Sequence, residues 1–185
     1  GYKNLCYIVS CSFTEGFYGK PRIDWKLLSE HCEGLIRLSG CIAGAIPKML
    51  LRGDYEGAKS KAEELSALFG RDGFYLEIQD HGLAQERRAA EGLLRIHRET
   101  GIPLALTNDA HYIEKKDAPY QDVLMCISMQ KSLSDPARLR FETDEFYVKS
   151  EEEMSRLFPD YPEAMENTAR IADMCNYDFE FGHYK

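Results

Sequence analysis

Residues 74–112, "FYLEIQDHGLAQERRAAEGLLRIHRETGIPLALTNDAHY", place two apolar runs on either side of a long amphipathic stretch. The first run, "FYLEIQD" (74–80), alternates as a strand does, and "IPLALTND" (102–109) is the second. Between them the spacing is helical and Gly101 ends the helix; one line of this helix carries Leu83, Arg87, Ala90, Leu94 and His97. Strand–helix–strand predicts parallel pairing, because parallel neighbours need a crossover connection.

The residues before this unit extend the same α/β pattern. "GLIRLSG" (34–40) predicts another short strand, and Asp54 predicts the start of a helix over 55–70. The buried face of that helix is expected to carry Ala58, Ala62, Leu65 and Phe69. Further upstream we expect a helix over 2–13 and another that begins after Asp24. The order of elements therefore favours an α/β fold with a parallel sheet.

The pattern changes after residue 113. Residues 115–130 are expected to be helical, and 132–146 are turn-rich. "FYVKS" (146–150) is a candidate edge strand, and Ser150 with Glu153 forms a capping box. A last amphipathic helix is predicted over 161–176, before an aromatic tail.

Composition restricts the class of protein. The net charge is −8, so this chain by itself is not expected to grip a phosphate backbone, which requires many Lys and Arg side chains. No apolar run is long enough to cross a membrane. The six cysteines form no CxxC pair, which favours reduced thiols over a disulfide or zinc-finger framework. We expect a soluble, cytoplasmic protein with no membrane partner.

Candidate reactive residues lie where the predicted strands end. Cys41 follows the first strand, and Asp109 and His111 follow the third. Because side chains two apart on an extended backbone point the same way, Asp109 and His111 could face one site. Carboxylate, imidazole and thiolate are ordinary ligands of Zn²⁺ or Mn²⁺. The alternative is that Asp109 caps a turn, His111 is half-exposed against Tyr112 and Cys41 is simply packed.

The remaining histidines and the carboxylate of Glu77, which lies within a predicted strand, are not assigned as metal ligands. His81 in "QDHG" is expected to close a turn before Gly82, and Glu77 must face solvent or find a partner. His31 and His97 are expected to be surface or half-buried residues on helices, and His183 to lie in a mobile tail. No GxSxG, GxxxxGK[ST] or GxGxxG motif occurs.

Several motifs, read in order, resemble a known family. They are "GYKNL", "PRID", "HCEGLIRLSGCIAGAIP", "FYLEIQDHG", "IPLALTNDAHY", "DAPYQDVLMCI", "FYVKSEEEM" and "PEAMENTARIADMC". Together they resemble the distal part of the PHP (polymerase and histidinol phosphatase) domain of bacterial DNA polymerase III alpha subunits. The resemblance implies an incomplete parallel (β/α)₇-type barrel over 1–149 with extra C-terminal helices, and a helical linker toward the polymerase core over 150–185.

The resemblance also implies candidate ligands and partners. By position, Cys41, Asp109 and His111 match metal ligands of the family, which binds up to three metal ions at the strand ends. Relatives with a complete site support phosphoester hydrolysis, including 3′–5′ exonuclease activity, whereas in others the domain is structural. The implied partners are the rest of the polymerase alpha chain, DNA through that chain, and a proofreading subunit.

The chain departs from the family pattern at its start. The family's domain opens with a His-x-His strand and supplies further His and Glu ligands before the position that matches Gly1. We therefore expect a piece of a longer chain, with a partial metal site and a bare sheet edge covered by homodimerisation, exchange of elements or the C-terminal tail. Scaffolding within a DNA-directed DNA polymerase is the favoured function; the alternatives are a phosphoesterase or exonuclease site and a free-standing PHP phosphatase.

Overall fold

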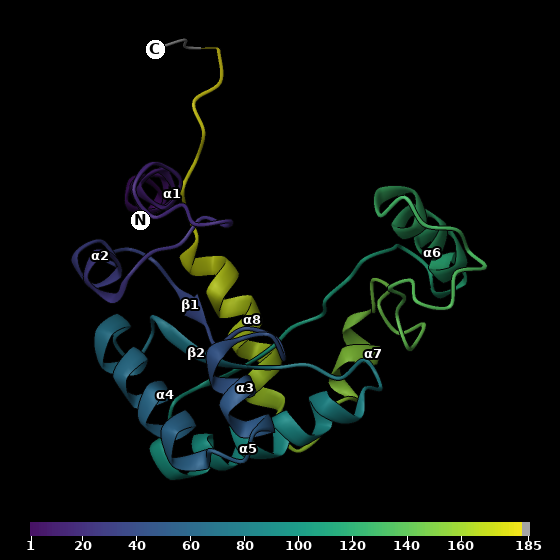
Figure 1. The fold of residues 1–185 in the computed structure, drawn as a ribbon. Coiled ribbons are helices and arrows are strands. Elements are labelled where there is room, and N and C mark those ends of the chain that lie inside the picture. The colour runs from purple at the N-terminus through teal and green to yellow at the C-terminus, as the bar shows by residue number, and fades with distance from the viewer. Residues whose placement is uncertain (183–185) are drawn as a thin grey trace.

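A computed structural model describes residues 1–182, so His183 lies outside the described residues. Three parallel strands form one sheet within that range, in the order β1-β2-β3. Figure 1 shows the helices around this sheet. In chain order the elements are α1 (Tyr2–Thr14), α2 (Trp25–Glu30), β1 (Arg37–Leu38), α3 (Ala45–Leu51), α4 (Tyr55–Phe69), β2 (Phe74–Ile78), α5 (Ala84–Thr100), β3 (Leu104–Leu106), the 3₁₀ helix η1 (Lys115–Asp117), α6 (Ala118–Ser128), α7 (Glu151–Ser155) and α8 (Pro162–Met174).

The predicted α/β class with parallel pairing is confirmed. β2 pairs in parallel with β1 through Arg37↔Phe74, and with β3 through Leu76↔Leu104. Two of the predicted caps are also present: the backbone N–H of Leu27 donates to Asp24, and that of Gly57 donates to Asp54. The capping box of Ser150 and Glu153 forms as expected.

The strands are shorter than the sequence predicts. β1 is reduced from the predicted 34–40 to Arg37–Leu38, because the residues after it turn at once into the loop that leads to α3. The candidate edge strand at 146–150 was wrong as a strand. It makes one isolated parallel bridge, between Tyr147 and Tyr112, with backbone hydrogen bonds from His111 to Phe146 and from Val148 to Tyr112, and the pairing does not extend into a ladder.

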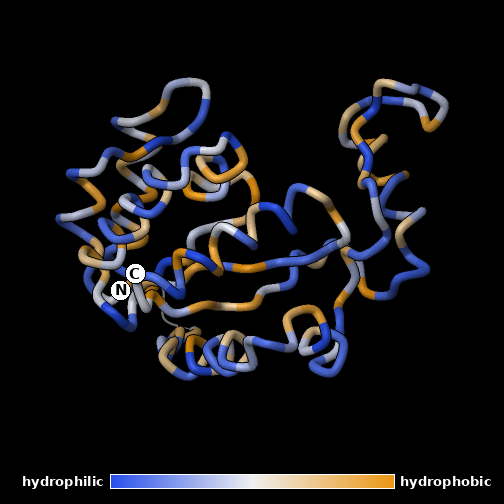
Figure 2. Tube along the Cα trace, turned by 90° about the horizontal axis from the view of Figure 1, so that it is seen from below, coloured by the Kyte–Doolittle hydropathy of each residue, from blue (hydrophilic) through white to orange (hydrophobic). Residues whose placement is uncertain are grey.

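One hydrophobic core joins the sheet to its helices. β2 supplies Phe74, Leu76 and Ile78, all 0% exposed, as expected for the central strand of a parallel sheet. Residues from α3, α4, α5, β3, α7 and α8 complete the same cluster, among them Ile46, Leu65, Ile96, Leu104, Met154 and Ala164. The helices α7 and α8 therefore share the core of the sheet. Figure 2 shows the apolar segments gathered along the centre of this body.

The buried face of α5 differs from the predicted line. Its buried residues are Glu86, Ala89, Ala90, Leu93 and Ile96, one position before most of the predicted line. The helix thus turns a carboxylate toward the interior, which the sequence pattern did not predict. The reason is a polar partner at the end of β2, described below.

A second region lies apart from the sheet. Figure 1 shows α6 on an arm away from the body of the molecule. Its side chains Tyr120, Leu124 and Ile127 are 59–69% exposed. Large apolar side chains of α1, such as Phe13 at 58%, are exposed too. Within residues 1–182 no helix has the length and apolar character that a membrane span requires.

The tail contacts the start of α1. Tyr177 stacks on Tyr2 with ring centroids 4.5 Å apart, and Phe179 meets the same ring edge-on at 5.1 Å. The tail thus covers a part of α1. The outer edge of β3 is covered by α8, through hydrogen bonds that Asn167 and Thr168 donate to strand carbonyls.

Replacing Tyr75 with phenylalanine is expected to raise the free energy of unfolding by about 1 kcal/mol. Tyr75 is 1% exposed, and its hydroxyl has no hydrogen-bond partner among the described residues. Burial without a partner raises the pKa of this phenol, and the same desolvation disfavours the folded state. Urea denaturation of the two proteins measures the difference; a loss of about 1 kcal/mol would instead reveal a partner for the hydroxyl.

Glu99 gives a pH dependence with a defined sign. Hydrogen bonds from Lys59 and Arg95, each 2.8 Å long, lower the pKa of Glu99 to about 2 from a usual 4.5. Because the folded-state pKa is lowered, the stabilisation is complete above the unfolded-state pKa and is lost as the pH falls from 4.5 toward 2. The stability difference between the natural protein and Glu99→Gln, from urea denaturation, should shrink over that range. A difference that does not change with pH would contradict this assignment.

Candidate metal centre

The candidate residues lie after the carboxyl ends of parallel strands, which share one edge of the sheet. Cys41 follows β1, and Asp109 and His111 follow β3. Between them, β2 is followed by Gln79, Asp80 and His81. The sheet order therefore places Cys41 on one side of the β2 end and the Asp109–His111 pair on the other.

Asp109 and His111 lie side by side. The Oδ1 atom of Asp109 is 3.2 Å from Nε2 of His111, and the two side chains are 47% and 38% exposed. The His111 ring packs against Phe141 at 4.8 Å, and its backbone N–H donates to the carbonyl of Phe146 at 2.7 Å. An accessible carboxylate and an imidazole thus share one position on the surface. These two groups are the closest pair of candidate ligands.

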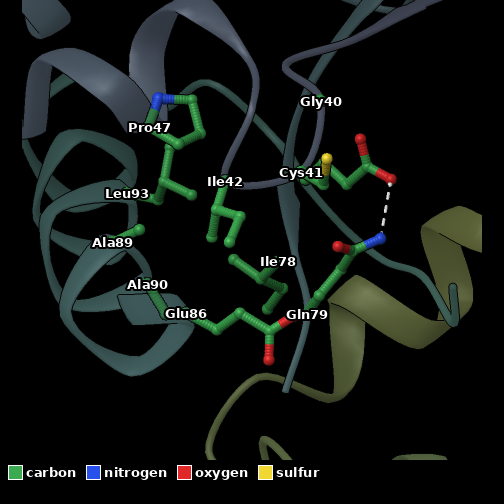
Figure 3. Close-up of a pocket in the computed structure, with 11 residues that line it drawn as sticks. Gly40, Cys41, Ile42, Pro47, Ile78, Gln79, Glu86, Ala89, Ala90 and Leu93 are labelled. Carbon is green, nitrogen blue, oxygen red and sulfur yellow. Dashed lines mark hydrogen bonds between the residues drawn. The ribbon is translucent and has the colours of Figure 1, made fainter. Parts of the chain in front are cut away.

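Cys41 lies in the loop between β1 and α3. The N–H of Gly44 donates to the Cys41 carbonyl at 2.7 Å, and a Cβ at Gly44 would meet the Ser39 carbonyl oxygen at 2.5 Å. Only glycine fits this turn without a shift of the backbone. The exposed Cys41 borders a pocket of about 20 Å³, the size of one water molecule, with Glu77 and Glu86 among its walls. Figure 3 shows Cys41 near one end of this pocket and Glu86 at the other.

These residues do not form one coordination sphere. Within the described range, no three His, Cys, Asp or Glu side chains gather as a metal site requires. The intervening β2 gives a physical reason, because strands two places apart are separated by roughly 10 Å. A catalytic zinc site needs about three protein ligands and an open position. The carboxylate of Asp109 and the imidazole of His111 are groups that a divalent metal binds, but the described residues supply an incomplete ligand set, and the ligand roles of Cys41, Asp109 and His111 stay predictions.

A buried polar pair at the end of β2 was not predicted from the sequence. His81 is 1% exposed and Glu86 is 6% exposed. Nδ1 of His81 lies 2.8 Å from Oε1 of Glu86, and the backbone N–H of His81 donates to Oε2 at 2.7 Å. Burial by itself would raise the pKa of Glu86, but these hydrogen bonds from His81 outweigh it, so the pKa is lowered.

The His81 ring of this pair also contacts the backbone of Asp109. The backbone N–H of Asp109 donates to Nε2 of His81 at 3.2 Å. The expected turn is present as well, because the N–H of Gly82 donates to Asp80 at 2.7 Å. The one signal in the sequence was the spacing of Glu86 with Ala89, Ala90 and Leu93 on a single helix face. A carboxylate on an apolar face calls for a buried donor, and His81 is that donor.

Glu77 found a partner, as its place in the strand requires. Its Oε1 accepts a hydrogen bond from the Thr107 hydroxyl at 2.6 Å, and its backbone N–H donates to the hydroxyl of Ser39. The side chain of Gln79 donates to the same Thr107 at 2.9 Å. These bonds tie the ends of β1, β2 and β3 together on the face opposite the main core. The loops that carry Cys41 and Asp109 follow directly after these strand ends.

Among the described residues, His31 and His97 stay outside this centre. His31 lies beside Tyr7 with ring centroids 4.5 Å apart, and Nδ1 of His97 is 2.8 Å from the carbonyl oxygen of Ile102. Both are partly buried, as expected from their helical positions. They act as helix-end and packing residues.

Comparison with known proteins shows which family and which proteins the chain resembles. Residues 1–81 match the family described as PHP domain, a range that includes Cys41 and ends at His81. The DNA polymerase III subunit alpha of Treponema pallidum is 51% identical over 176 residues, which cover 95% of this chain and 15% of that protein. Those of Borreliella burgdorferi and Thermus aquaticus are 48% and 42% identical and cover 97% and 98% of the chain.

The chain spans 15–16% of the length of these relatives. The similarity extends well beyond the PHP match, into the loop of Asp109 and His111 and into α7 and α8. Residues 1–81 therefore match the PHP domain family, and nearly the whole chain is similar to one segment of bacterial DNA polymerase III alpha subunits.

Proposed function

We propose that this chain is a segment of a DNA polymerase III alpha subunit, in which it acts mainly as a scaffold for DNA replication. The remainder of that longer chain would carry the DNA-directed DNA polymerase activity. Within it, residues 1–149 would form the distal part of a (β/α)₇-type PHP barrel, and 150–185 would lead toward the polymerase core. Because α8 shares the core of the sheet, the connecting segment 150–185 would be packed against the sheet through this helix.

One observation carries the scaffold role: the described residues bring together the two candidate ligands Asp109 and His111, without a third. A hydrolytic metal centre would need further ligands from elsewhere in the longer chain. In that chain Cys41, Asp109 and His111 would be the contribution of this segment to a site for a divalent metal, Zn²⁺ or Mn²⁺. A bound metal of this kind activates water for phosphoester hydrolysis.

The exposed apolar side chains support a larger assembly. Large exposed apolar patches on a folded domain mark interaction sites, among them protein–protein contacts. On α6 they are Tyr120, Val123, Leu124 and Ile127, and on α1 they are Leu5, Tyr7, Val9 and Phe13. We propose that other parts of the alpha chain cover these surfaces. A proofreading subunit and a second copy of the segment are the competing occupants.

The alternative function is a metal-dependent phosphoesterase or 3′–5′ exonuclease site. The 3.2 Å approach of Asp109 to His111, both accessible to solvent, is the observation in its favour. A free-standing PHP phosphatase is the weaker alternative, because the similarity to polymerase subunits includes α7 and α8.

The test compares this chain with a full-length polymerase subunit that carries it. Zn²⁺ and Mn²⁺ content and 3′–5′ hydrolysis of single-stranded DNA are measured with Asp109→Ala, His111→Ala and the control Asp144→Asn, an exposed carboxylate in the neighbouring turn. A scaffold predicts unchanged hydrolysis in all variants. Hydrolysis in the long chain that both alanine variants abolish, and the control retains, would establish the enzymatic alternative instead.

A further inference from the structure

We propose that His81, held by Glu86, is a positioning residue for the Asp109–His111 pair. The proposal rests on the proposed role of that pair as metal ligands. Neither His81 nor Glu86 would touch the metal. Their role would be to fix the backbone of the loop after β3, so that the two exposed side chains meet a metal in one arrangement.

The hydrogen bonds of His81 define its role. Nε2 accepts the backbone N–H of Asp109 at 3.2 Å, so the ring proton must be on Nδ1. From Nδ1 the proton points to Glu86, at 2.8 Å. The second oxygen of the same carboxylate accepts the backbone N–H of His81 at 2.7 Å. Glu86 thus fixes both the tautomer and the orientation of the ring, and the ring fixes Asp109.

A second set of contacts holds the other side of the loop. The Phe146 ring lies flat on the His81 ring, with centroids 4.4 Å apart and planes 3° from parallel. The carbonyl of Phe146 accepts the backbone N–H of His111 at 2.7 Å. The hydroxyl of Thr143 donates to the His81 carbonyl at 2.6 Å. His81 is therefore linked to Asp109 directly and to His111 through Phe146.

Metal sites use related contacts around their ligands, although the partner of His81 is the backbone N–H of Asp109 rather than its carboxylate. Side chains one step removed from a metal hold the ligands by hydrogen bonds, and their loss lowers metal affinity about 10- to 100-fold. A buried histidine that served packing alone would need no acceptor facing the loop of the candidate ligands. The direction of Nε2 toward Asp109 is the feature that distinguishes the two roles.

Two substitutions of His81 separate these roles. Glutamine places its amide near the position of Nε2, so His81→Gln can keep the acceptor for the Asp109 N–H. Asparagine is shorter and places its amide near Nδ1, so His81→Asn keeps a donor for Glu86 and loses the contact with Asp109. Both variants lose the ring and its stacking on Phe146, which makes them a matched pair.

The first readout needs no metal. Hydrogen exchange of the Asp109 amide is expected to be about tenfold faster in His81→Asn than in His81→Gln, the value of one hydrogen bond. The amides of Leu76 and Ile78, which belong to the β2 ladder, should exchange alike in the two variants. Equal exchange at Asp109, or equally faster exchange at all of these amides, would overturn the proposal.

The second readout is metal affinity in the full-length subunit, by titration with Zn²⁺. His81→Asn is expected to lower the affinity about tenfold or more, and His81→Gln to restore most of it. If Asp109→Ala lowers the affinity but His81→Asn does not, the positioning role fails. If Asp109→Ala has no effect, the ligand role in the proposed function fails, and the exchange of the Asp109 amide still decides whether His81 holds the loop.

The unaltered protein offers a check if both variants fail to fold. The ¹⁵N chemical shifts of the His81 ring should show a proton on Nδ1 and none on Nε2. A proton on Nε2 would exclude a hydrogen bond from the Asp109 amide and would overturn the proposal.

Discussion

Replacing Glu86 with alanine is expected to lower the free energy of unfolding by about 4 kcal/mol. Glu86 is 6% exposed, and its two oxygens accept from the backbone and the ring of His81. The substitution leaves two buried N–H donors without acceptors, and each costs about 1–3 kcal/mol. The loss is a large part of the stability of a domain of this size.

Urea denaturation of Glu86→Ala measures this loss, and Glu91→Ala on the same helix is the matched control. Glu91 is exposed, so its removal should change the stability by no more than about 0.5 kcal/mol. Glu86→Gln should fall between the two, because an amide keeps one acceptor oxygen and turns an NH₂ toward a donor. Similar stabilities of Glu86→Ala and Glu91→Ala would mean that the His81–Glu86 pair contributes nothing to the fold.

The stabilisation by Glu86 also has a defined pH dependence. The pKa of Glu86 is lowered, because the hydrogen bonds from His81 outweigh the effect of burial. A lowered folded-state pKa means that the contribution is complete above the usual carboxylate pKa and is lost as the pH falls through the folded-state value.

The sequence predicted the elements that depend on local signals. Caps at Asp24, Asp54 and Ser150 are local, because each side chain bonds a backbone N–H three residues away. The parallel sheet was also predictable, because its strands alternate with helices. Gly101 ends α5 with a φ of +70°, a conformation that glycine adopts without strain.

The failures depend on contacts that are distant in sequence. His81 was expected only to close a turn, and Glu86 received no assignment, because each is polar and neither alone suggests burial. Their burial depends on each other, on Phe146 and on the Asp109 loop, 28 residues from His81. The same pair accounts for the shifted face of α5, because Glu86 turns inward with Ala89 and Ala90.

The candidate site also has one part that local sequence predicted and one part that depends on the arrangement of distant segments. Spacing alone predicted that Asp109 and His111 share a site, and they lie 3.2 Å apart. The place of Cys41 depends on the order of the strands, which the sequence does not specify. With β2 in the middle, Cys41 meets the pocket of Glu77 and Glu86 instead of the exposed pair.

The double substitution Asn167→Ala and Thr168→Val is expected to lower the free energy of unfolding by about 3 kcal/mol and to promote aggregation. Asn167 donates to the carbonyl of Leu104 at 2.8 Å, and the Thr168 hydroxyl donates to that of Leu106 at 2.7 Å. Both carbonyls point away from β2, because β2 pairs with the alternate groups of β3. Without these donors, the buried outer edge of β3 loses its hydrogen-bond partners.

Urea denaturation and light scattering measure the two effects, with Thr168→Ser and Glu166→Ala as controls. Thr168→Ser keeps the hydroxyl, and Glu166 is an exposed residue on the same helix, so both should behave as the natural protein does. A double variant as stable and as soluble as these controls would show that α8 does not protect the edge. If the double variant loses stability and solubility as expected, α8 is the element that covers the outer edge of β3. A polymerase chain continuing from α8 would then be anchored at β3, next to the loop that carries Asp109 and His111.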